Sequence, residues 1–172
     1  MKLQGEQCFL RALEPHDVEH LFQWENQTEH WLVSGTKAPF SKHQLQQYLK
    51  NTRDIYADRQ LRLMICTEAH PVGCIDLFDF EPEHRRAGIG ILIGEDEERG
   101  KGIAKCALNL LVDYAFEILS LHQLYANVPA NNTASHKLFQ SLGFEHVGTR
   151  KDWLLDGKKW RDEWMYQLID NR

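Results

Sequence analysis

The chain has 172 residues, of which 42% are hydrophobic and 26% are charged, and its formal net charge is −5 at pH 7. These values fit one globular domain over residues 1–172, with a sizeable core and no long disordered segment. The negative charge argues against a broad nucleic-acid surface, which needs a basic excess, and no apolar run approaches the roughly 20 residues of a membrane span.

The first part of the chain predicts a strand, two helices and two further strands. Apolar residues form short runs between turn residues in the expected strands, and recur every three or four positions in the expected helices. Pro15 suits a first helical position, and Ser41 suits a helix cap. We expect a strand over residues 8–13, a helix over 15–26, an irregular segment over 31–40, a helix from 41, and strands over 61–66 and 72–80.

The second part predicts a third strand of an antiparallel meander, followed by alternating helices and strands. A glycine-rich turn separates the meander from the next helix, and Asp156 with Gly157 predicts a turn between the last two strands. We expect strands over residues 86–93, 124–128, 144–153 and 160–169, and helices over 103–116 and from 132 or 133 to 143.

The glycine-rich turn over residues 99–104 predicts an anion site. Gly100 and Gly102 leave backbone amides uncovered where a helix begins, and such amides bind phosphate groups. A nucleoside-triphosphate loop does not fit, because Gly102 stands where that loop needs a hydroxyl. A dinucleotide loop does not fit either, because Lys105 replaces its last glycine and the preceding strand is antiparallel. The plain alternative is a connecting turn.

Two motifs together carry a family resemblance. Arg99-x-x-Gly102-x-Ala104 at the start of a helix resembles the acyl-CoA pyrophosphate loop of the GNAT N-acetyltransferase superfamily. Downstream, Asn132-x-x-Ser135-x-x-Leu138-Phe139-x-x-x-Gly143-Phe144 is similar to the Asn-led helix of that superfamily, which ends in Gly-Phe. The resemblance covers nearly the whole chain. It implies the α/β (α+β) GNAT acyl-CoA N-acyltransferase fold, a mixed, mostly antiparallel twisted sheet of about seven strands flanked by about four helices.

The resemblance implies that a primary amine attacks the thioester of acetyl-CoA directly, without a metal. The strand over residues 86–93 is expected to follow the pantetheine arm, with a β-bulge near residues 92–94, and the backbone N–H of Leu92 is expected to stabilise the oxyanion. The expected cofactor-binding residues are Ile91, Leu92, Ile93, Arg99, Gly100, Lys101, Gly102, Ile103, Ala104, Asn132 and Ser135. For Asn132 the plain alternative is a helix cap.

Two proton transfers then need side chains or water, because an alkylammonium has a pKa of about 10.4 and the departing thiolate takes up a proton. Many GNAT members use a Tyr as the acid, and this chain has Phe139 at the matching position, which leaves that role to water or another donor. The candidates for the general base or for contacts with the amine are Asp76, Asp79, Glu81, Glu83 and His84. For each of these, the plain alternative is a solvated surface position.

Within the superfamily, the chain resembles the spermidine and diamine N-acetyltransferases, through its acidic strand over residues 75–80 and the following His84-Arg85-Arg86. Acidic side chains suit a polycation. The leading acceptor is therefore a polyamine such as spermidine, or another small amine. The alternatives are a ribosomal-protein type N-terminal acetyltransferase and a catalytically silent CoA-binding module.

The remaining signals have plainer readings. The four cysteines lack C-x-x-C spacing and no signal-peptide pattern precedes Cys8, so we expect reduced thiols in the cytoplasm. His16 and His20 lie one helical turn apart, but a third metal ligand is missing, so a helix surface is expected. The closing-strand residues Trp153, Trp160 and Trp164 suit core or subunit contacts, compatible with a homo-oligomer.

Overall fold

The computed structural model describes residues 2–172, with the side chain of residue 33 excepted. Its strands are β1 (Lys2–Gln4), β2 (Phe9–Ala12), β3 (Leu61–Cys66), β4 (Pro71–Glu81), β5 (Arg86–Ile93), β6 (Gln123–Pro129), β7 (Glu145–Asp156) and β8 (Lys159–Ile169). Its α-helices are α1 (Val18–Glu25), α2 (Trp31–Ser34), α3 (Lys42–Asn51), α4 (Ile55–Asp58), α5 (Ile103–Asp113) and α6 (Thr133–Ser141). A π-helical turn, Tyr114–Ile118, continues α5.

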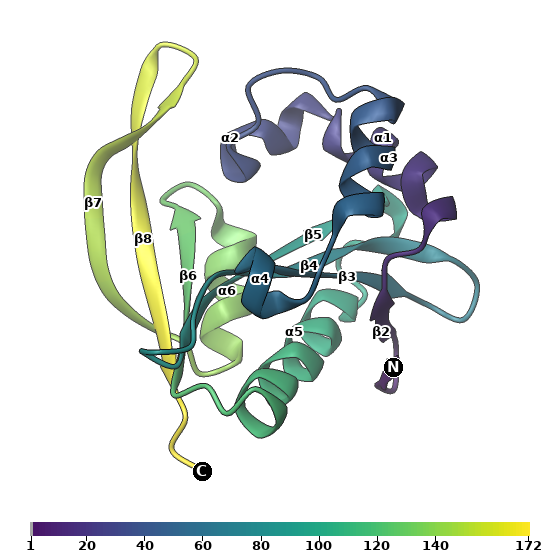
Figure 1. Cartoon of the computed structure of the whole chain (residues 1–172). Coiled ribbons are helices and arrows are strands. Elements are labelled where there is room, and N and C mark those ends of the chain that lie inside the picture. Colours follow the sequence, from purple (N-terminus) through teal and green to yellow (C-terminus); the bar gives the residue numbers. More distant parts are fainter. Residues whose placement is uncertain (1) are drawn as a thin grey trace.

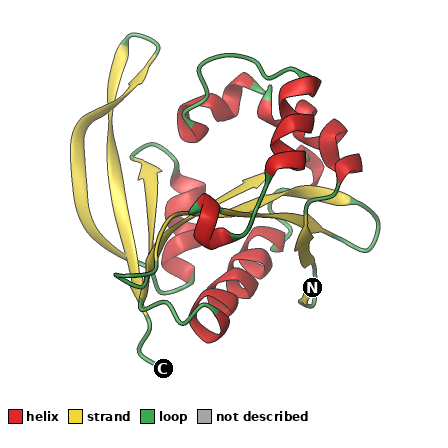
Figure 2. Ribbon diagram, in the orientation of Figure 1, coloured by secondary structure: helices red, strands yellow, loops and turns green. Residues whose placement is uncertain are grey.

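The strands form one mixed sheet in the order β1-β2-β3-β4-β5-β6-β8-β7. All neighbouring pairs are antiparallel except β5 with β6. In Figures 1 and 2 the helices α5 and α6 lie on one side of the sheet, and α1, α2 and α3 lie on the other. This confirms the predicted meander and the mixed, mostly antiparallel sheet.

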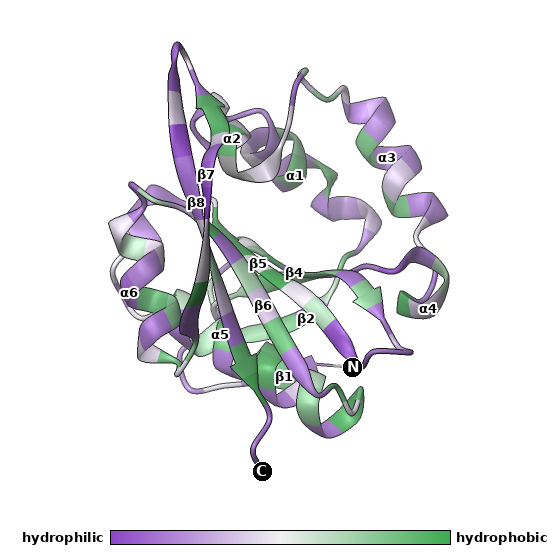
Figure 3. Ribbon diagram, turned by 90° about the vertical axis from the view of Figure 1, so that its left-hand side faces the viewer, coloured by the Kyte–Doolittle hydropathy of each residue, from purple (hydrophilic) through white to green (hydrophobic). Residues whose placement is uncertain are grey.

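Each face of the sheet has its own core. On one face, Leu108 and Leu111 of α5 pack with Ile75 and Ile89 of the meander. On the other face, Leu21 and Trp24 of α1 pack with Met64, Cys66 and Cys74 of β3 and β4. Figure 3 shows the matching pattern, with hydrophobic colours on these helices and strands and mostly hydrophilic colours along the projecting part of β7 and β8. Successive residues of a strand therefore serve opposite layers.

Short elements are the main difference from the predicted order. The strand β1 and the one-turn helices α2 and α4 were not expected, because three or four residues are too few for a visible period.

Each cysteine in residues 2–172 is a free thiol. The structure brings His20 against Trp24, with ring centroids 5.2 Å apart. Over the same residues, no helix combines the length and the apolar content that a membrane span requires.

A buried ion pair joins β2 to the start of α1. Asp17 is fully buried and receives hydrogen bonds from Arg11 at 2.7 and 2.8 Å and from the Glu14 amide at 2.7 Å. Burial opposes the charge of Asp17, but the Arg11 and Glu14 hydrogen bonds outweigh it and lower the pKa of this carboxyl. The ionised form is therefore favoured in the folded protein.

We expect Asp17→Asn to lower the free energy of unfolding at pH 7 by about 1–3 kcal/mol, because Arg11 loses its charged partner. A lowered native pKa stabilises the fold above the unfolded-state pKa of about 3.9, and this contribution is lost as the pH falls through the native pKa. The difference between variant and wild type should therefore shrink in acid. Urea unfolding at pH 7 and pH 3 measures it, with Glu19→Gln, which breaks the exposed pair with Lys42, as a control expected to stay below about 1 kcal/mol.

Candidate active site

The candidate site is the opening between β5 and β6. These parallel strands pair only at Arg86, Ala87 and Gly88 with Gln123, Leu124 and Tyr125. Beyond these pairs, β5 stays with β4 to Ile93 and β6 stays with β8 to Pro129, so the two strands separate (Figure 1). Each strand then presents a row of peptide groups to the gap that the ladder does not use.

The register shows which amides of β5 face this gap. The Gly94 amide donates to the Val72 carbonyl at 2.9 Å, and hydrogen-bonded pairs alternate along an antiparallel ladder, so Leu92 pairs in the same way with Cys74. A Cβ built on Gly73 of β4 comes within 2.1 Å of the Leu92 carbonyl oxygen, which agrees with this direction. The Leu92 N–H therefore faces β4, and its predicted oxyanion role is wrong. The peptide groups of Ile91 and Ile93 face the gap.

The bulge predicted near residues 92–94 has a counterpart at the end of β5, where two consecutive residues, Gly94 and Glu95, lie opposite Val72 of the neighbouring strand. The pairing of β4 with β5 runs without a shift from Gly73 with Ile93 to Phe78 with Gly88. A register shift also lies at the other end of this pairing, between Phe78 and Glu81, where Asp79 has a φ of 47°. Just beyond β5, the amides of Gly94 and Glu95 both donate to the Val72 carbonyl, at 2.9 and 3.3 Å.

The glycine-rich turn leads directly into α5 and leaves the first amides of the helix uncovered. Gly100 and Gly102 have φ values of 76° and 84°, and Gly102, at the cap position, has no side chain to bond the helix amides. A Cβ on Gly102 would meet the side-chain oxygen of Gln7 at 2.8 Å. The turn with the amides of Ile103 and Ala104 therefore fits a phosphate group.

Most of the acidic residues before the turn are individually paired. Lys101 contacts Glu98 at 3.2 Å, and the Glu95 carboxylate accepts a hydrogen bond from the Trp24 indole at 2.9 Å. Asp96 pairs with Arg99 at 3.0 Å. Three of the four carboxylates of this segment, those of Glu95, Asp96 and Glu98, are thus engaged by side chains and do not cap the amides of the turn.

Arg99 does not point into the turn. Its guanidinium donates to the Ile93 carbonyl at 3.2 and 3.4 Å and contacts His30 Nε2 at 2.9 Å. His30 ends a 3-10 turn, Thr28–His30, that continues into α2. The arginine predicted to bind phosphate therefore lies at the end of β5 and joins it to the segment before α2.

On α6, the structure shows the plainer role of Asn132. Its side-chain oxygen accepts a hydrogen bond from the Ser135 amide at 3.2 Å, which caps the helix. Phe139 is only 4% exposed and packs between Phe144 and Tyr166, with ring centroids 5.2 and 6.3 Å away. Its ring therefore belongs to the core and offers no proton donor.

Asp76 lies on the α1 side of the sheet, opposite Gly90 of β5, and is tied into a charge network. Arg62 of β3 donates to both Asp76 oxygens at 2.6 and 3.2 Å and to Glu25 of α1 at 2.5 Å. The three side chains are only 12–22% exposed. Burial opposes the charge of Arg62, but the Asp76 and Glu25 carboxylates raise its pKa well above the ordinary value. This Arg62 network, made of Glu25, Arg62 and Asp76, carries a net charge of about −1.

Asp79 has a phenol as its partner. Tyr125, in the last β5–β6 pair, donates from its hydroxyl to Asp79 at 3.1 Å. Burial, followed by the Asp79 charge, raises the pKa of Tyr125 to about 12, so the phenol stays protonated near neutral pH. The Phe78 ring packs edge-on against Tyr125 at 5.8 Å and covers Gly88, where a Cβ would come within 2.2 Å of the ring.

The other acidic candidates lie beyond the gap. Glu81 pairs with Arg86 at 3.0 Å, and Glu83 contacts Arg59 at 3.7 Å. His84 is exposed in the turn between β4 and β5. The structure therefore brings Asp76 and Asp79 to the sheet face beside the gap and leaves Glu81, Glu83 and His84 at the end of the hairpin.

Four side chains at this site were missed from the sequence: Glu25, His30, Arg62 and Tyr125. Arg62 had a signal, because it is the charged residue in the otherwise apolar run of residues 61–66. A charge inside a half-buried strand needs a partner. Nothing in the sequence pairs it with Glu25, which comes from a different element.

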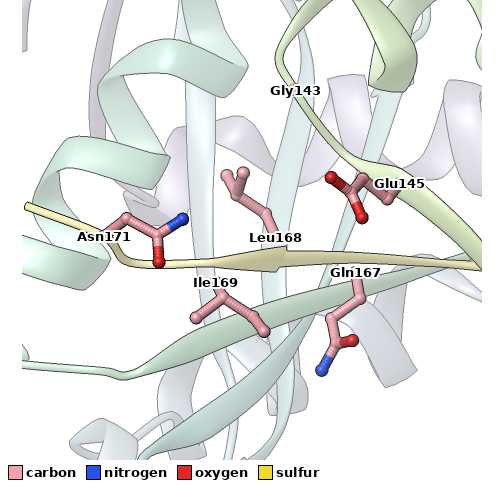
Figure 4. Close-up of a pocket in the computed structure, with 6 residues that line it drawn as sticks. All are labelled: Gly143, Glu145, Gln167, Leu168, Ile169 and Asn171. Atoms are coloured by element: carbon pink, nitrogen blue, oxygen red, sulfur yellow. The ribbon is translucent and has the colours of Figure 1, made fainter.

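A small pocket lies away from the gap, along the last residues of β8 (Figure 4). It is lined by Gly143, Glu145, Gln167, Leu168, Ile169 and Asn171. None of these side chains belongs to the predicted cofactor or acceptor residues. The strand gap and the turn before α5 therefore remain the candidate site.

Known proteins match this chain along most of its length. A family model described as "Acetyltransferase (GNAT) domain" matches residues 7–145. Spermidine N(1)-acetyltransferase of Escherichia coli K12 is 30% identical over 142 residues, which cover 81% of this chain and 73% of that protein.

Solved structures share the fold. The spermidine N-acetyltransferase of Vibrio cholerae, solved in complex with CoA and spermine, superposes with a TM-score of 0.87 at 24% identity and covers 96% of both chains. The ribosomal-protein-S5-alanine acetyltransferase of Vibrio fischeri superposes with a TM-score of 0.85 at 19% identity, over 99% of this chain and 97% of that one. At these identities the superpositions show that the fold is shared.

Proposed function

Because this chain belongs to the GNAT acetyltransferases and is an acetyl-CoA-dependent N-acetyltransferase, we propose that its acceptor is a polyamine such as spermidine, acetylated on a primary amine by direct attack in a ternary complex. One observation carries the choice of acceptor. Two anionic points, the Arg62 network and Asp79, flank the Phe78 ring on the sheet face beside the gap. Ammonium groups separated by methylene units match that order of charge, apolar surface and charge.

The described residues fit acetyl-CoA, which supplies an activated acetyl thioester when bound. The uncovered amides at the start of α5 would hold the pyrophosphate, and Lys101 would add charge. The Ile91 carbonyl and the Ile93 N–H, which face the gap, would bind the amides of the pantetheine arm, as a neighbouring strand does. Asn132 and Ser135 lie at the start of α6 and would flank the arm from the other side of the gap.

The acceptor amine reacts in its neutral form, so its ammonium must first lose a proton. The Arg62 network binds the reacting ammonium near Gly90, where Arg62 fixes the position of the Asp76 carboxylate by two hydrogen bonds. The proton then leaves to water. The Ile91 N–H, which faces the gap, stabilises the oxyanion, and water protonates the thiolate because Phe139 has no hydroxyl.

The test is thiol release from acetyl-CoA with three acceptors: spermidine, n-butylamine, and a peptide with a free N-terminal alanine. We expect spermidine to have the highest kcat/KM. Preference for the peptide would replace the polyamine by a protein N-terminus. If CoA binds but no acceptor is turned over, the silent CoA-binding module is the better account.

We expect Asp79→Asn to raise KM for spermidine about tenfold or more, with little change in kcat and little change for n-butylamine. The reason is that Asp79 contacts a distal ammonium, and a hydrogen bond to a charged group contributes about 1.5–3 kcal/mol. Steady-state kinetics with both amines measures the effect. Glu83→Gln is the matched control, because it removes a carboxylate that faces Arg59. Equal losses for both amines would contradict a distal contact.

A further inference from the structure

The guanidinium of Arg99 binds a backbone carbonyl of β5 that faces the proposed path of the CoA arm. The Ile93 carbonyl lies on the edge of β5 that faces the gap, and Arg99 donates to it at 3.2 and 3.4 Å. The same side chain directly precedes Gly100 of the turn. Arg99 can therefore serve either the Ile93 carbonyl or a bound pyrophosphate, and its present position excludes the second role.

Two side chains hold Arg99 in this position: Asp96 pairs with its guanidinium at 3.0 Å, and His30 Nε2 lies 2.9 Å from it. An arginine nitrogen only donates, so the 2.9 Å contact makes His30 Nε2 the acceptor and places the ring proton on Nδ1. That Nδ1 is buried without a hydrogen-bond partner among the residues described. An unsatisfied buried donor costs about 1–3 kcal/mol. The contact between His30 and Arg99 therefore leaves the Nδ1–H of the same ring without its hydrogen bond.

The contact also reaches the acceptor side. His30 precedes α2, whose first residue, Trp31, donates its indole N–H to the Glu25 carbonyl at 3.0 Å. Glu25 is the α1 member of the Arg62 network, and α2 lies against β7 across the gap. His30 is therefore linked through Trp31 to the backbone of Glu25, whose side chain borders the proposed ammonium site.

We infer that Arg99 and His30 form a latch that CoA opens: binding of CoA draws Arg99 from His30 and the Ile93 carbonyl to the pyrophosphate, and so links the donor site to the segment over residues 28–34. This inference rests on the proposed CoA site. His30 is here a positioning residue, because it acts through Arg99. By linkage, a ligand that opens the latch binds less tightly while the latch is intact.

The test compares CoA binding by calorimetry in wild type, His30→Phe and His30→Gln. Phe keeps a ring of similar shape and removes the acceptor nitrogen, so we expect CoA to bind about fivefold more tightly, as the loss of one ordinary hydrogen bond predicts. Gln offers an acceptor oxygen to Arg99 and should return the affinity toward wild type. His43→Phe, at an exposed position of α3, is the control and should leave it unchanged.

A second readout does not use affinity. In ¹⁵N NMR spectra, the Nε2 of His30 should change its shift when CoA is added to wild type and should not change in Arg99→Ala. Unchanged or weaker CoA binding in His30→Phe, or a His30 signal insensitive to CoA, would overturn the latch. Failure of wild type to bind CoA would instead overturn the proposed donor site, so the two failures are distinguishable.

Discussion

CoA is expected to raise the melting temperature of the wild-type protein and to leave that of Gly102→Glu nearly unchanged. At 100 times the dissociation constant, a ligand stabilises the folded state by about 2.7 kcal/mol, which corresponds to roughly 5–10 °C for a domain of this size. A glutamate at position 102 brings a negative charge and a side chain to the amides that face the pyrophosphate, and its Cβ meets Gln7 at 2.8 Å. Thermal unfolding with and without CoA measures the shift.

The substitution also strains the backbone, since Gly102 has a φ of 84°. Gly157→Glu is the matched control: Gly157 has a φ of 62°, lies in the β7–β8 turn and has open space around its Cβ position. It should lower the melting temperature by a similar backbone penalty and keep the full shift with CoA. A normal shift in Gly102→Glu would show that CoA binds elsewhere.

The geometry of the glycine-rich turn could be predicted from the sequence, because the backbone alone makes it. Gly100 and Gly102 predict a turn with positive φ, which the structure shows. Such a turn before a helix either connects two elements or binds an anion. The meander was equally visible, since its three strands follow each other with short turns. Short sequence patterns are enough to predict a turn or a meander, because residues close together in the sequence form these structures.

The phase of the strand pairing could not be predicted. Leu92, Ile91 and Ile93 are all apolar, and a shift of one residue exchanges the amides that face β4 for those that face the gap. The hydrogen bond from the Gly94 amide to the Val72 carbonyl shows which residues of β5 pair with β4 through their amides. The sequence could therefore indicate β5 as the source of an oxyanion donor and still select an amide that faces β4.

Side-chain partners from distant elements were the other missing part. Asp76 looked like a free acidic candidate, but Arg62 of β3, 14 positions away, binds it, and Arg62 also binds Glu25 of α1, 37 positions from the arginine. Arg99 looked like a phosphate ligand, and its partner His30 lies 69 positions away. A charged side chain on a half-buried surface pairs with an oppositely charged or hydrogen-bond-accepting group that lies close to it. For partners far apart in the sequence, the fold determines which groups lie close.

The Arg62 network gives the largest expected effect on stability. We expect Arg62→Met to lower the free energy of unfolding by about 3–5 kcal/mol, because it leaves the Asp76 and Glu25 carboxylates close together, mostly buried and without a cation. Urea unfolding at pH 7 measures the loss. The matched control is Arg86→Met, which breaks the pair with Glu81 where both side chains are about 40% exposed, and it should cost about 1 kcal/mol or less.

Neutralising the whole network separates charge from packing. The triple variant Arg62→Met, Glu25→Gln, Asp76→Asn should recover most of the stability lost in Arg62→Met, because no unpaired buried charge remains. It should still bind CoA, whose proposed contacts lie on β5, α5 and α6, and it should lose activity toward spermidine. If the triple variant stays as unstable as Arg62→Met, the methylene stem of Arg62 supports the fold by packing. If it stays stable and active, the reacting ammonium binds elsewhere, and Asp79 becomes the principal anionic contact for the acceptor.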